Sequence, residues 1–278
     1  MPERRPDLFA KGKKSSPEVA IHLADLLERL GQHPSQVQIR KEFVRRIGIQ
    51  KADRVLDVGS GTGVLTREIP SLVGEMGHVI GSDSNYRLVE TARKLAKEKG
   101  LSGKVSYCMG EGEIINFSAD NAYHVTVSSH LFSHIVEPGQ ILYEMIRVTK
   151  PGGRLAILDA DFATLSTSHP DQEVTERLSD FMINDYLINA RGIRLLPPLF
   201  IELGLEKFDL VAFSHLEREA EGPMTLLLLE VLGSALEAGA IKPEETALWK
   251  EHLAKQAEEG GYYLSVGMLA LYGMKPAL

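Results

Sequence analysis

The hydrophobic positions of the chain first follow a helical period and then alternate between short apolar runs and longer amphipathic stretches. Residues 17–48 have helical spacing, which Gly31 and Pro34 interrupt, so two helices are predicted there. Five short β-rich runs predict strands: 54–58, 78–83, 104–109, 122–129 and 154–160. Between them, helices are predicted at 64–73, 86–100 and 141–150. This alternation indicates a mostly parallel sheet with helices on both faces.

After residue 161 the pattern changes. Residues 162–200 make a long connection: FATLSTSHP is predicted to be a loop, EVTERLSDFMINDYLIN a helix, and ARGIRLLPPLF a return toward the sheet. A strand follows at 207–216, then two helices and a final strand, at 223–238, 243–258 and 262–273. No internal repeat and no linker divides the chain.

Composition excludes several function classes. With 44% hydrophobic and 25% charged residues the chain is an ordinary globular protein, and its net charge of −7 argues against nucleic acid as a partner. The longest apolar stretch, MTLLLLEVLGSAL, contains a glutamate and is too short to span a bilayer. A single cysteine, Cys108, excludes an internal disulfide. No N-terminal segment resembles a signal peptide, so a cytoplasmic protein without a membrane partner is predicted.

The N-terminal stretch PERRPDLFAKGKKSSP is locally basic and contains several prolines. It is either a frayed tail or a lid that orders over a substrate.

The strongest chemical signal is VLDVGSGTG at 55–63, where three glycines alternate after a predicted strand. A dinucleotide fold has the pattern G-x-G-x-x-G, but Val64 stands where its last glycine would be. The turn is uncharged and follows Asp57, which suits a ligand with a positive end and an amino-acid part better than a pyrophosphate. A plain structural turn is the alternative.

Two further strand ends carry acids. Asp83 ends the second strand, and a carboxylate there can accept both hydroxyls of a ribose. After the third strand comes GEGE, where Glu111 could accept a hydrogen bond from an exocyclic amine such as that of adenine. The three strand ends together predict a nucleoside site.

In this order, VLDVGSGTGVLT, VIGSDSN, GEGE…INF and EMIRVTKPGGRLAILDAD resemble the motifs of class I S-adenosylmethionine-dependent methyltransferases, in particular the small-molecule branch called type 11 or UbiE-like. The resemblance covers roughly residues 40–216. It implies a seven-stranded Rossmann-like α/β sheet, mostly parallel with an antiparallel last strand and helices on both faces. It also implies a helical cap (1–50), the cofactor-binding half of the core (51–161), a helical insertion over the acceptor pocket (162–205) and the C-terminal part of the same core (206–278).

The resemblance further assigns site residues. S-adenosyl-L-methionine is the implied cofactor, with S-adenosyl-L-homocysteine as product, and its binding residues are carried over by position: Asp57, Gly59, Ser60, Gly61, Thr62, Gly63, Asp83, Ser84, Asn85, Glu111, Gly112 and Ser128. Ser129 borders the donor methyl group with Ser128. One position departs from the family: His124 stands where an acidic residue is common within the fourth strand, and we interpret it as a repacked strand residue.

Candidate catalytic residues follow the fourth and fifth strands. In SSHLFSHI, His130 is the preferred general base, and a polar pocket wall is the alternative; His134 matches a histidine that braces loops in the family. No metal is predicted, because these two histidines lack a third ligand. Asp161 could bind an acceptor amine, bind a metal or cap a turn.

The acceptor is predicted to be a small, partly hydrophobic organic molecule. Candidate pocket residues are Tyr186, Asn189, Arg191 and the walls Leu195, Leu196, Pro197 and Pro198. The predicted reaction is methylation of O, N or C. The alternative is a methyltransferase-fold protein that binds the cofactor but catalyses cyclisation or isomerisation. The leucine-rich segment 223–238 could pair two copies in a homodimer.

Overall fold

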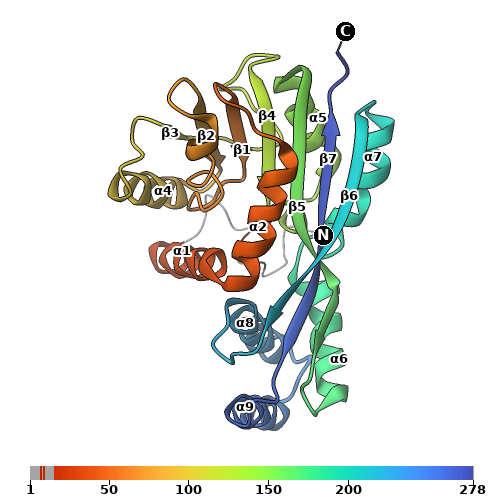
Figure 1. The fold of residues 1–278 in the computed structure, drawn as a ribbon. Coiled ribbons are helices and arrows are strands. Elements are labelled where there is room, and N and C mark those ends of the chain that lie inside the picture. Colours follow the sequence, from red (N-terminus) through yellow and green to blue (C-terminus); the bar gives the residue numbers. More distant parts are fainter. Residues whose placement is uncertain (1–6, 8, 10–15, 278) are drawn as a thin grey trace.

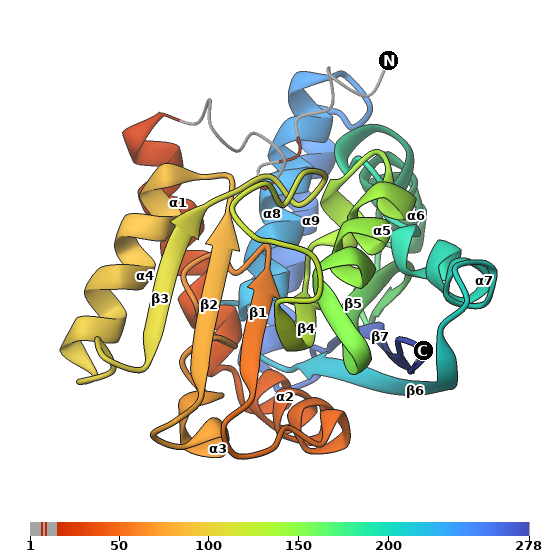
Figure 2. The same cartoon turned by 90° about the horizontal axis from the view of Figure 1, so that it is seen from above.

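The computed structural model describes residues 7, 9 and 16–277. Its centre is a seven-stranded sheet with the order β3-β2-β1-β4-β5-β7-β6 (Figures 1 and 2). The strands are β1 (Arg54–Val58), β2 (His78–Asp83), β3 (Val105–Met109), β4 (Tyr123–Ser129), β5 (Thr149–Thr167), β6 (Glu206–Glu217) and β7 (Leu264–Met274). Strand β7 pairs antiparallel with both β5 and β6, and all other strand pairs are parallel. This is the predicted sheet, with strand order reversing between β1 and β4.

The helices lie on both faces of the sheet and at one end of it (Figure 2). They are α1 (Pro17–Gln32), α2 (Pro34–Ile47), α3 (Pro70–Val73), α4 (Tyr86–Glu98), α5 (Pro138–Val148), α6 (Gln172–Phe181), α7 (Leu196–Glu202), α8 (Pro223–Glu237) and α9 (Pro243–Glu258). Short non-α turns occupy Phe132–His134, Met182–Tyr186 and Gly192–Leu195. Among residues 16–277, no helix has both the length and the apolar character needed to cross a membrane.

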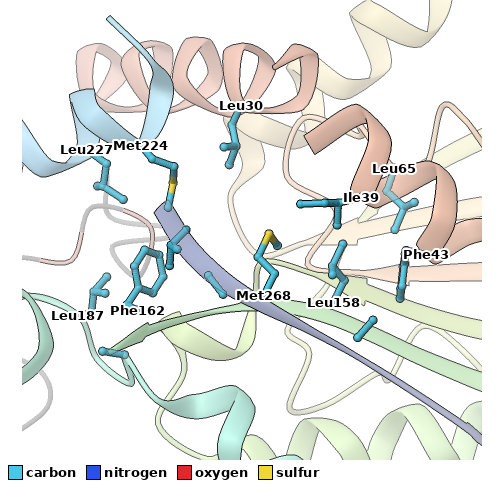
Figure 3. Packing of buried hydrophobic residues seen from close by; sticks show 14 of the residues in the cluster. Leu30, Ile39, Phe43, Leu65, Leu158, Phe162, Leu187, Met224, Leu227 and Met268 are labelled. Atoms are coloured by element: carbon cyan, nitrogen blue, oxygen red, sulfur yellow. The ribbon is translucent and has the colours of Figure 1, made fainter. Parts of the chain in front are cut away.

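The two-residue period of the strands separates two apolar layers. Val55 packs with α2 and α4 in the larger cluster, whereas its neighbour Leu56 packs with α5 and α7 in the other. The larger cluster extends from Phe43 of α2 through Leu158 to Met224 of α8 (Figure 3). The sheet is therefore buried on both sides, as parallel sheets require.

Two predictions were wrong. The helix expected at 64–73 is mostly a series of turns, with only Pro70–Val73 helical. Its hydrogen bonds mix periods, since Arg67 N–H donates to Gly63 O and Glu68 N–H to Leu65 O. The Thr66 hydroxyl donates to Asp57, which draws this segment toward the strand end at the expense of regular helix.

The loop expected at FATLSTSHP is strand up to Thr167, so the insertion begins later than residue 162. The continuation of β5 pairs with the first half of β7, with Ser166 opposite Ser265. Where this pairing is irregular, Thr164 Oγ1 accepts the N–H of Gly267 at 2.8 Å. The Ser/Thr-rich segment is therefore a strand because it pairs with β7, which lies nearly a hundred residues later in the sequence.

Strands β5, β6 and β7 continue past the short strands, and α6, α8 and α9 pack around this extension (Figure 1). Trp249 of α9 is fully buried there, and its indole N–H donates to Thr175 Oγ1 of α6 at 3.0 Å. The extension and the sheet share one apolar cluster.

Candidate functional site

A cavity of about 410 Å³ lies where β1, β2, β3 and β4 end, under α1 and α2. Its polar lining includes Asp57, Ser60, Thr62, Asp83, Asn85, Glu113, Ser129, His130 and His134. Its apolar lining includes Leu23, Leu27, Leu30, Leu65 and Ile141. The position agrees with the rule that ligands of such sheets bind beyond the carboxyl ends of the strands, near the reversal of strand order.

The glycine turn after β1 borders this cavity. Gly59, Gly61 and Gly63 have φ angles of +72°, +54° and +81°, a region that glycine alone adopts without strain. Gly59 and Gly61 line the cavity, but Gly63 lies behind it, where an added Cβ would be 2.3 Å from the Tyr107 hydroxyl oxygen. Between them, the buried hydroxyls of Ser60 and Thr62 have no hydrogen-bond partner among the residues described.

Asp57 is buried under this turn, with 1% of its surface exposed. Burial raises the pKa of its carboxyl to about 7, although a 2.6 Å hydrogen bond from the Thr66 hydroxyl opposes the rise. The nearby carboxylate of Asp83 adds to it. A cation entering the cavity would favour the ionised form of Asp57.

Asp83 holds the glycine turn and the start of α4 together. Its Oδ2 accepts the N–H of Gly61 and its Oδ1 accepts the N–H of Asn85, both at 2.8 Å. Asn85 in turn caps α4, accepting the N–H groups of Arg87 and Leu88. The backbone of Ser84 also interacts with this carboxylate. Because a carboxylate offers about four acceptor positions, Asp83 retains capacity for a ligand hydroxyl. Ser84 also lines the cavity.

The end of β3 corrects one prediction. Glu111 is exposed and does not line the cavity, whereas Gly110, Gly112 and Glu113 do. GEGE contains two carboxylates, and of these Glu113 lines the cavity, while Glu111 forms an isolated backbone bridge with Ile114.

At the end of β4 the cavity residue also differs from the predicted one, here by one position. Ser128 is fully buried and its hydroxyl donates to Val58 O at 2.9 Å, which joins β4 to β1. Ser129 and His130 line the cavity instead. The fifth strand supplies a carboxylate to this loop: Asp159 accepts the N–H of Phe132 at 2.5 Å.

His130 has a neutral ring. Its pKa falls to about 3, first because of burial and then because of the Arg40 guanidinium and two neighbouring histidines. Nδ1 lies 2.9 Å from Ser129 Oγ, and φ is +57°. A residue with this pKa is deprotonated at neutral pH but is a weak base.

His134 binds the N-terminal segment. Its Nδ1 lies 3.0 Å from Asp7 Oδ2, and its ring stacks on Phe9 with centroids 4.6 Å apart. Burial alone would lower the pKa of His134, but the Asp7 carboxylate outweighs it and the pKa is raised. Phe9 lines the cavity, and residues 2–6, 8 and 10–15 of the N-terminal stretch interpreted as tail or lid lie outside the described residues.

Several predicted acceptor residues lie elsewhere. Asp161 pairs with Arg194, Oδ2 to Nε at 2.7 Å, and is not part of the cavity lining. Of the segment that contains Tyr186, Asn189 and Arg191, only Ile188 contributes to the lining that the described residues form. The predicted walls at 195–198 do not contribute either, and α1 supplies apolar walls in their place.

His124 also lies outside the cavity lining. It accepts the N–H of Arg54 at 2.9 Å, and its Nε2 lies 2.9 Å from the Lys150 ammonium group. It is a strand residue held by hydrogen bonds within β4 and its surroundings, and the interpretation that it repacks a family position stays a prediction.

Sequence reasoning missed two cavity residues on α2, Gln36 and Arg40. Both are buried, and Arg40 donates to Glu68 Oε1 at 2.7 Å and to Gly31 O at 2.8 Å. The sequence did contain a signal for these residues: Gln36 and Arg40 are polar, but they stand at positions of α2 where the helical spacing predicts buried apolar residues.

Comparison with known proteins agrees with this geometry. A family model described as a methyltransferase domain matches residues 49–187, half of the chain. The ubiquinone/menaquinone biosynthesis C-methyltransferase UbiE of Yersinia pestis is 38% identical over 112 residues, which cover 40% of this chain and 44% of that protein. The match thus spans less than half the length of this curated relative.

Solved structures share the fold. A putative methyltransferase from Bacillus halodurans has a TM-score of 0.60 at 18% identity, covering 85% of this chain and 98% of its own. Phosphoethanolamine N-methyltransferase 2 of Haemonchus contortus, in complex with S-adenosyl-L-methionine, has a TM-score of 0.58 at 14% identity, covering 96% of this chain and 59% of its own. By its matched domain and its strand-end site, this chain belongs to the methyltransferase domain family.

Proposed function

We propose that this protein transfers a methyl group from S-adenosylmethionine to an O, N or C atom of a small organic molecule and releases S-adenosylhomocysteine. The observation that carries the proposal is that the tips of three adjacent strands line one cavity: the glycine turn, Asp83, and the segment 110–113. Family membership and the relatives' names support the same reaction class.

The residues fit the cofactor. The glycine turn would hold the methionine part, where the unpartnered buried hydroxyls of Ser60 and Thr62 can donate to its carboxylate. Asp83 would accept a ribose hydroxyl. Gly112 and Glu113 would take the adenine position that the resemblance gave to Glu111. When bound, S-adenosylmethionine supplies an electrophilic methyl group on a positively charged sulfur, next to the buried carboxyl of Asp57.

The remaining residues would position the acceptor. Orienting two reactants in a closed site can lower a barrier by about 7–11 kcal/mol, so most of the acceleration would come from placement. His130 would orient the acceptor through a hydrogen bond rather than act as a strong base, because its pKa of about 3 makes it a weak proton acceptor. His134 would brace the loop through Asp7.

Calorimetric titration with S-adenosylhomocysteine tests the proposal. Wild type should bind it, and Asp83→Ala should bind it roughly 5- to 150-fold more weakly, corresponding to about 1–3 kcal/mol for charge-assisted hydrogen bonds. Glu111→Ala is the matched control, because that carboxylate is exposed outside the cavity. Absence of binding by wild type would refute the proposal, and equal affinities of wild type and Asp83→Ala would remove Asp83 from the site.

Among the described residues, none favours the alternative, a reaction without methyl transfer. The departure at His124 left room for it, and His124 takes part in strand packing outside the cavity lining. Product mass separates the two, since only methylation adds a methyl group to the acceptor.

A cytoplasmic location stays part of the proposal and is favoured by the single cysteine. A homodimer through α8 finds less support. Leu227, Leu228 and Leu232 of that helix are buried within the chain and are not available to a second copy.

A further inference from the structure

We infer that Glu217, His215 and Gln36 form a buried hydrogen-bond relay that fixes one amide oxygen in the cavity, and that this oxygen recognises a hydroxyl or N–H group on an otherwise apolar acceptor. The identity of that ligand as a methyl acceptor rests on the proposed function. The relay itself rests on the contacts of three side chains that are each at most 1% exposed.

Glu217 is the fixed end of the relay. Its Oε1 accepts the N–H of Met224 at 2.8 Å, and its Oε2 accepts the N–H and the hydroxyl of Thr225 at 2.9 and 3.0 Å. These donors belong to the first turn of α8. Burial alone would raise the pKa of Glu217, but these hydrogen bonds and His215 lower it overall. Glu217 is therefore an ionised group that only accepts.

His215 connects Glu217 to Gln36 through its two ring nitrogens. Its Nε2 lies 2.9 Å from Glu217 Oε1, and because the carboxylate cannot donate, Nε2 carries a proton. Its Nδ1 lies 3.2 Å from Gln36 Nε2.

Met268 decides which way the Gln36 amide points. Gln36 Nε2 is 3.1 Å from Met268 Sδ, and a thioether can only accept. The NH₂ group must therefore face both Met268 and His215, so Nδ1 of His215 is the acceptor. A flipped amide would set its oxygen against the sulfur, with two acceptors in contact. Met268 and His215 together fix the orientation of the Gln36 amide.

The oxygen of Gln36 is left for a ligand. Gln36 lines the cavity, and among the described residues its buried Oε1 has no hydrogen-bond partner. A buried acceptor without a donor costs free energy, which a donor on a bound molecule would recover. Gln36 shares this wall of the cavity with Arg40, which lies four residues further along α2.

The surroundings define the ligand class. Leu23, Leu27 and Leu30 of α1 line the same cavity and favour an apolar body. An anionic group at Oε1 would meet lone pairs instead of a donor. A phenol, an alcohol or an N–H heterocycle meets both requirements.

A metal ion is the competing interpretation, because His33, His215 and Glu217 offer ligand atoms within 4.8 Å of one another. The relay is favoured because coordination would displace donors from Glu217 that cap α8.

The test uses matched probes that differ only in the donor: phenol against anisole, and 2-naphthol against 2-methoxynaphthalene. Affinities are measured by calorimetry, with and without S-adenosylhomocysteine. Wild type should bind at least one hydroxyl probe about 10-fold or more tightly than its methyl ether. Gln36→Leu should reduce this preference to within about 3-fold. Gln38→Leu, the same change at an exposed position of α2, should preserve it.

A preference that survives Gln36→Leu, or a wild type with no preference in either pair, would overturn the proposal. Binding of S-adenosylhomocysteine is read separately. If wild type prefers the hydroxyl probe but does not bind S-adenosylhomocysteine, the proposed function fails and the Gln36 site stands. If wild type binds S-adenosylhomocysteine but shows no preference for the hydroxyl probe, the Gln36 site fails and the proposed function stands.

His215→Leu tests the relay as a positioning device. It should lower the preference, and the double variant with Gln36→Leu should lose no more than Gln36→Leu alone, because both changes act on one amide oxygen. Multiplicative losses would contradict the relay, as would stoichiometric zinc in wild type that is lost in His215→Leu. If His215→Leu does not fold, the comparison of Gln36→Leu with Gln38→Leu decides.

Discussion

The three glycines after β1 all have positive φ angles, but one of them also lies against a neighbouring ring. At Gly63 a Cβ would meet the Tyr107 hydroxyl at 2.3 Å, whereas at Gly61 the nearest atom is a flexible leucine methyl at 3.1 Å. Backbone conformation therefore explains all three glycines. Close packing adds a second requirement at Gly63, whereas at Gly59 an added Cβ would meet the flexible end of Leu131 at 2.9 Å.

Gly63→Ala should destabilise the protein by roughly 2–4 kcal/mol, because backbone strain and overpacking add. Gly100→Ala is the matched control: its φ is +69° but nothing lies within 4 Å of the added Cβ, so it should cost about 1 kcal/mol. Urea unfolding measures both. Tyr107→Phe removes the clashing oxygen and should recover part of the Gly63→Ala loss. Equal losses at the two glycines would show that packing contributes nothing.

Asp57 should make stability depend on pH. Its carboxyl has a pKa of about 7 in the folded protein, above the ordinary value of 3.8, so the stability of the protonated form is fully present below about pH 4 and is lost as pH rises through about 7. Asp57→Asn removes this titration. The free energy of unfolding of the variant, relative to wild type, should increase by roughly 1–3 kcal/mol between pH 5 and pH 8. A difference that stays constant with pH would contradict the assignment.

At the residue scale the sequence located the strand ends but not always the residue that faces the ligand. Asp57, Asp83, Gly59 and Gly61 line the cavity and Gly63 lies directly behind it, while their role in cofactor binding stays a prediction. Glu113 replaces Glu111 at the cavity. Residues 112 and 113 form a turn after β3, and no local signal in GEGE fixes which of its two carboxylates lines the cavity.

At the scale of elements, α1 is held over the cavity by a buried ion pair. Arg67 donates from one nitrogen to both oxygens of Glu28 at 2.8 Å and also binds Thr62 O in the glycine turn. The Arg67 side chain is 4% exposed, so losing its carboxylate would leave a poorly solvated charge.

Glu28→Gln should therefore lower the free energy of unfolding by roughly 1–3 kcal/mol and increase hydrogen exchange in α1. Glu42 pairs with Arg45 and Arg46 on the exposed side of α2, and Glu42→Gln should change stability by less than about 1 kcal/mol. Similar effects of the two substitutions would show that burial of the Arg67 pair does not matter.

The insertion shows where element prediction reached its limit. The amphipathic stretch that became α6 was recognised, but the preceding FATLST was assigned to a loop because Ser and Thr resemble turn residues. Its strand character depends on pairing with β7, which lies about a hundred residues later. Strand propensity depends on the partner strand more than helix propensity does on its surroundings.

At the scale of the whole molecule, the sheet and its extension should unfold together. Strands β5, β6 and β7 run through both, and a single apolar cluster joins Val55 in the sheet to Trp249 in the extension. We propose that the four predicted segments of the chain, 1–50, 51–161, 162–205 and 206–278, unfold as one cooperative unit.

The only tryptophan reports on this proposal, because Trp249 lies in the extension while circular dichroism reports on the entire fold. Urea transitions followed by the two signals should coincide. An earlier fluorescence transition would show that α6, α8 and α9 unfold as a separate unit.

The sequence by itself determined the order of strands and helices, the glycine turn and two of the acids at the strand ends. These follow from local causes: the period of apolar residues, the φ angles that only glycine adopts freely, and the position of polar groups after each strand. Tertiary structure decided what distant segments contribute. Gln36 of α2, His215 of β6 and Met268 of β7 meet only because the helical cap folds over the far edge of the sheet. The orientation of one amide group is set by partners up to 232 residues away, and no local pattern encodes it.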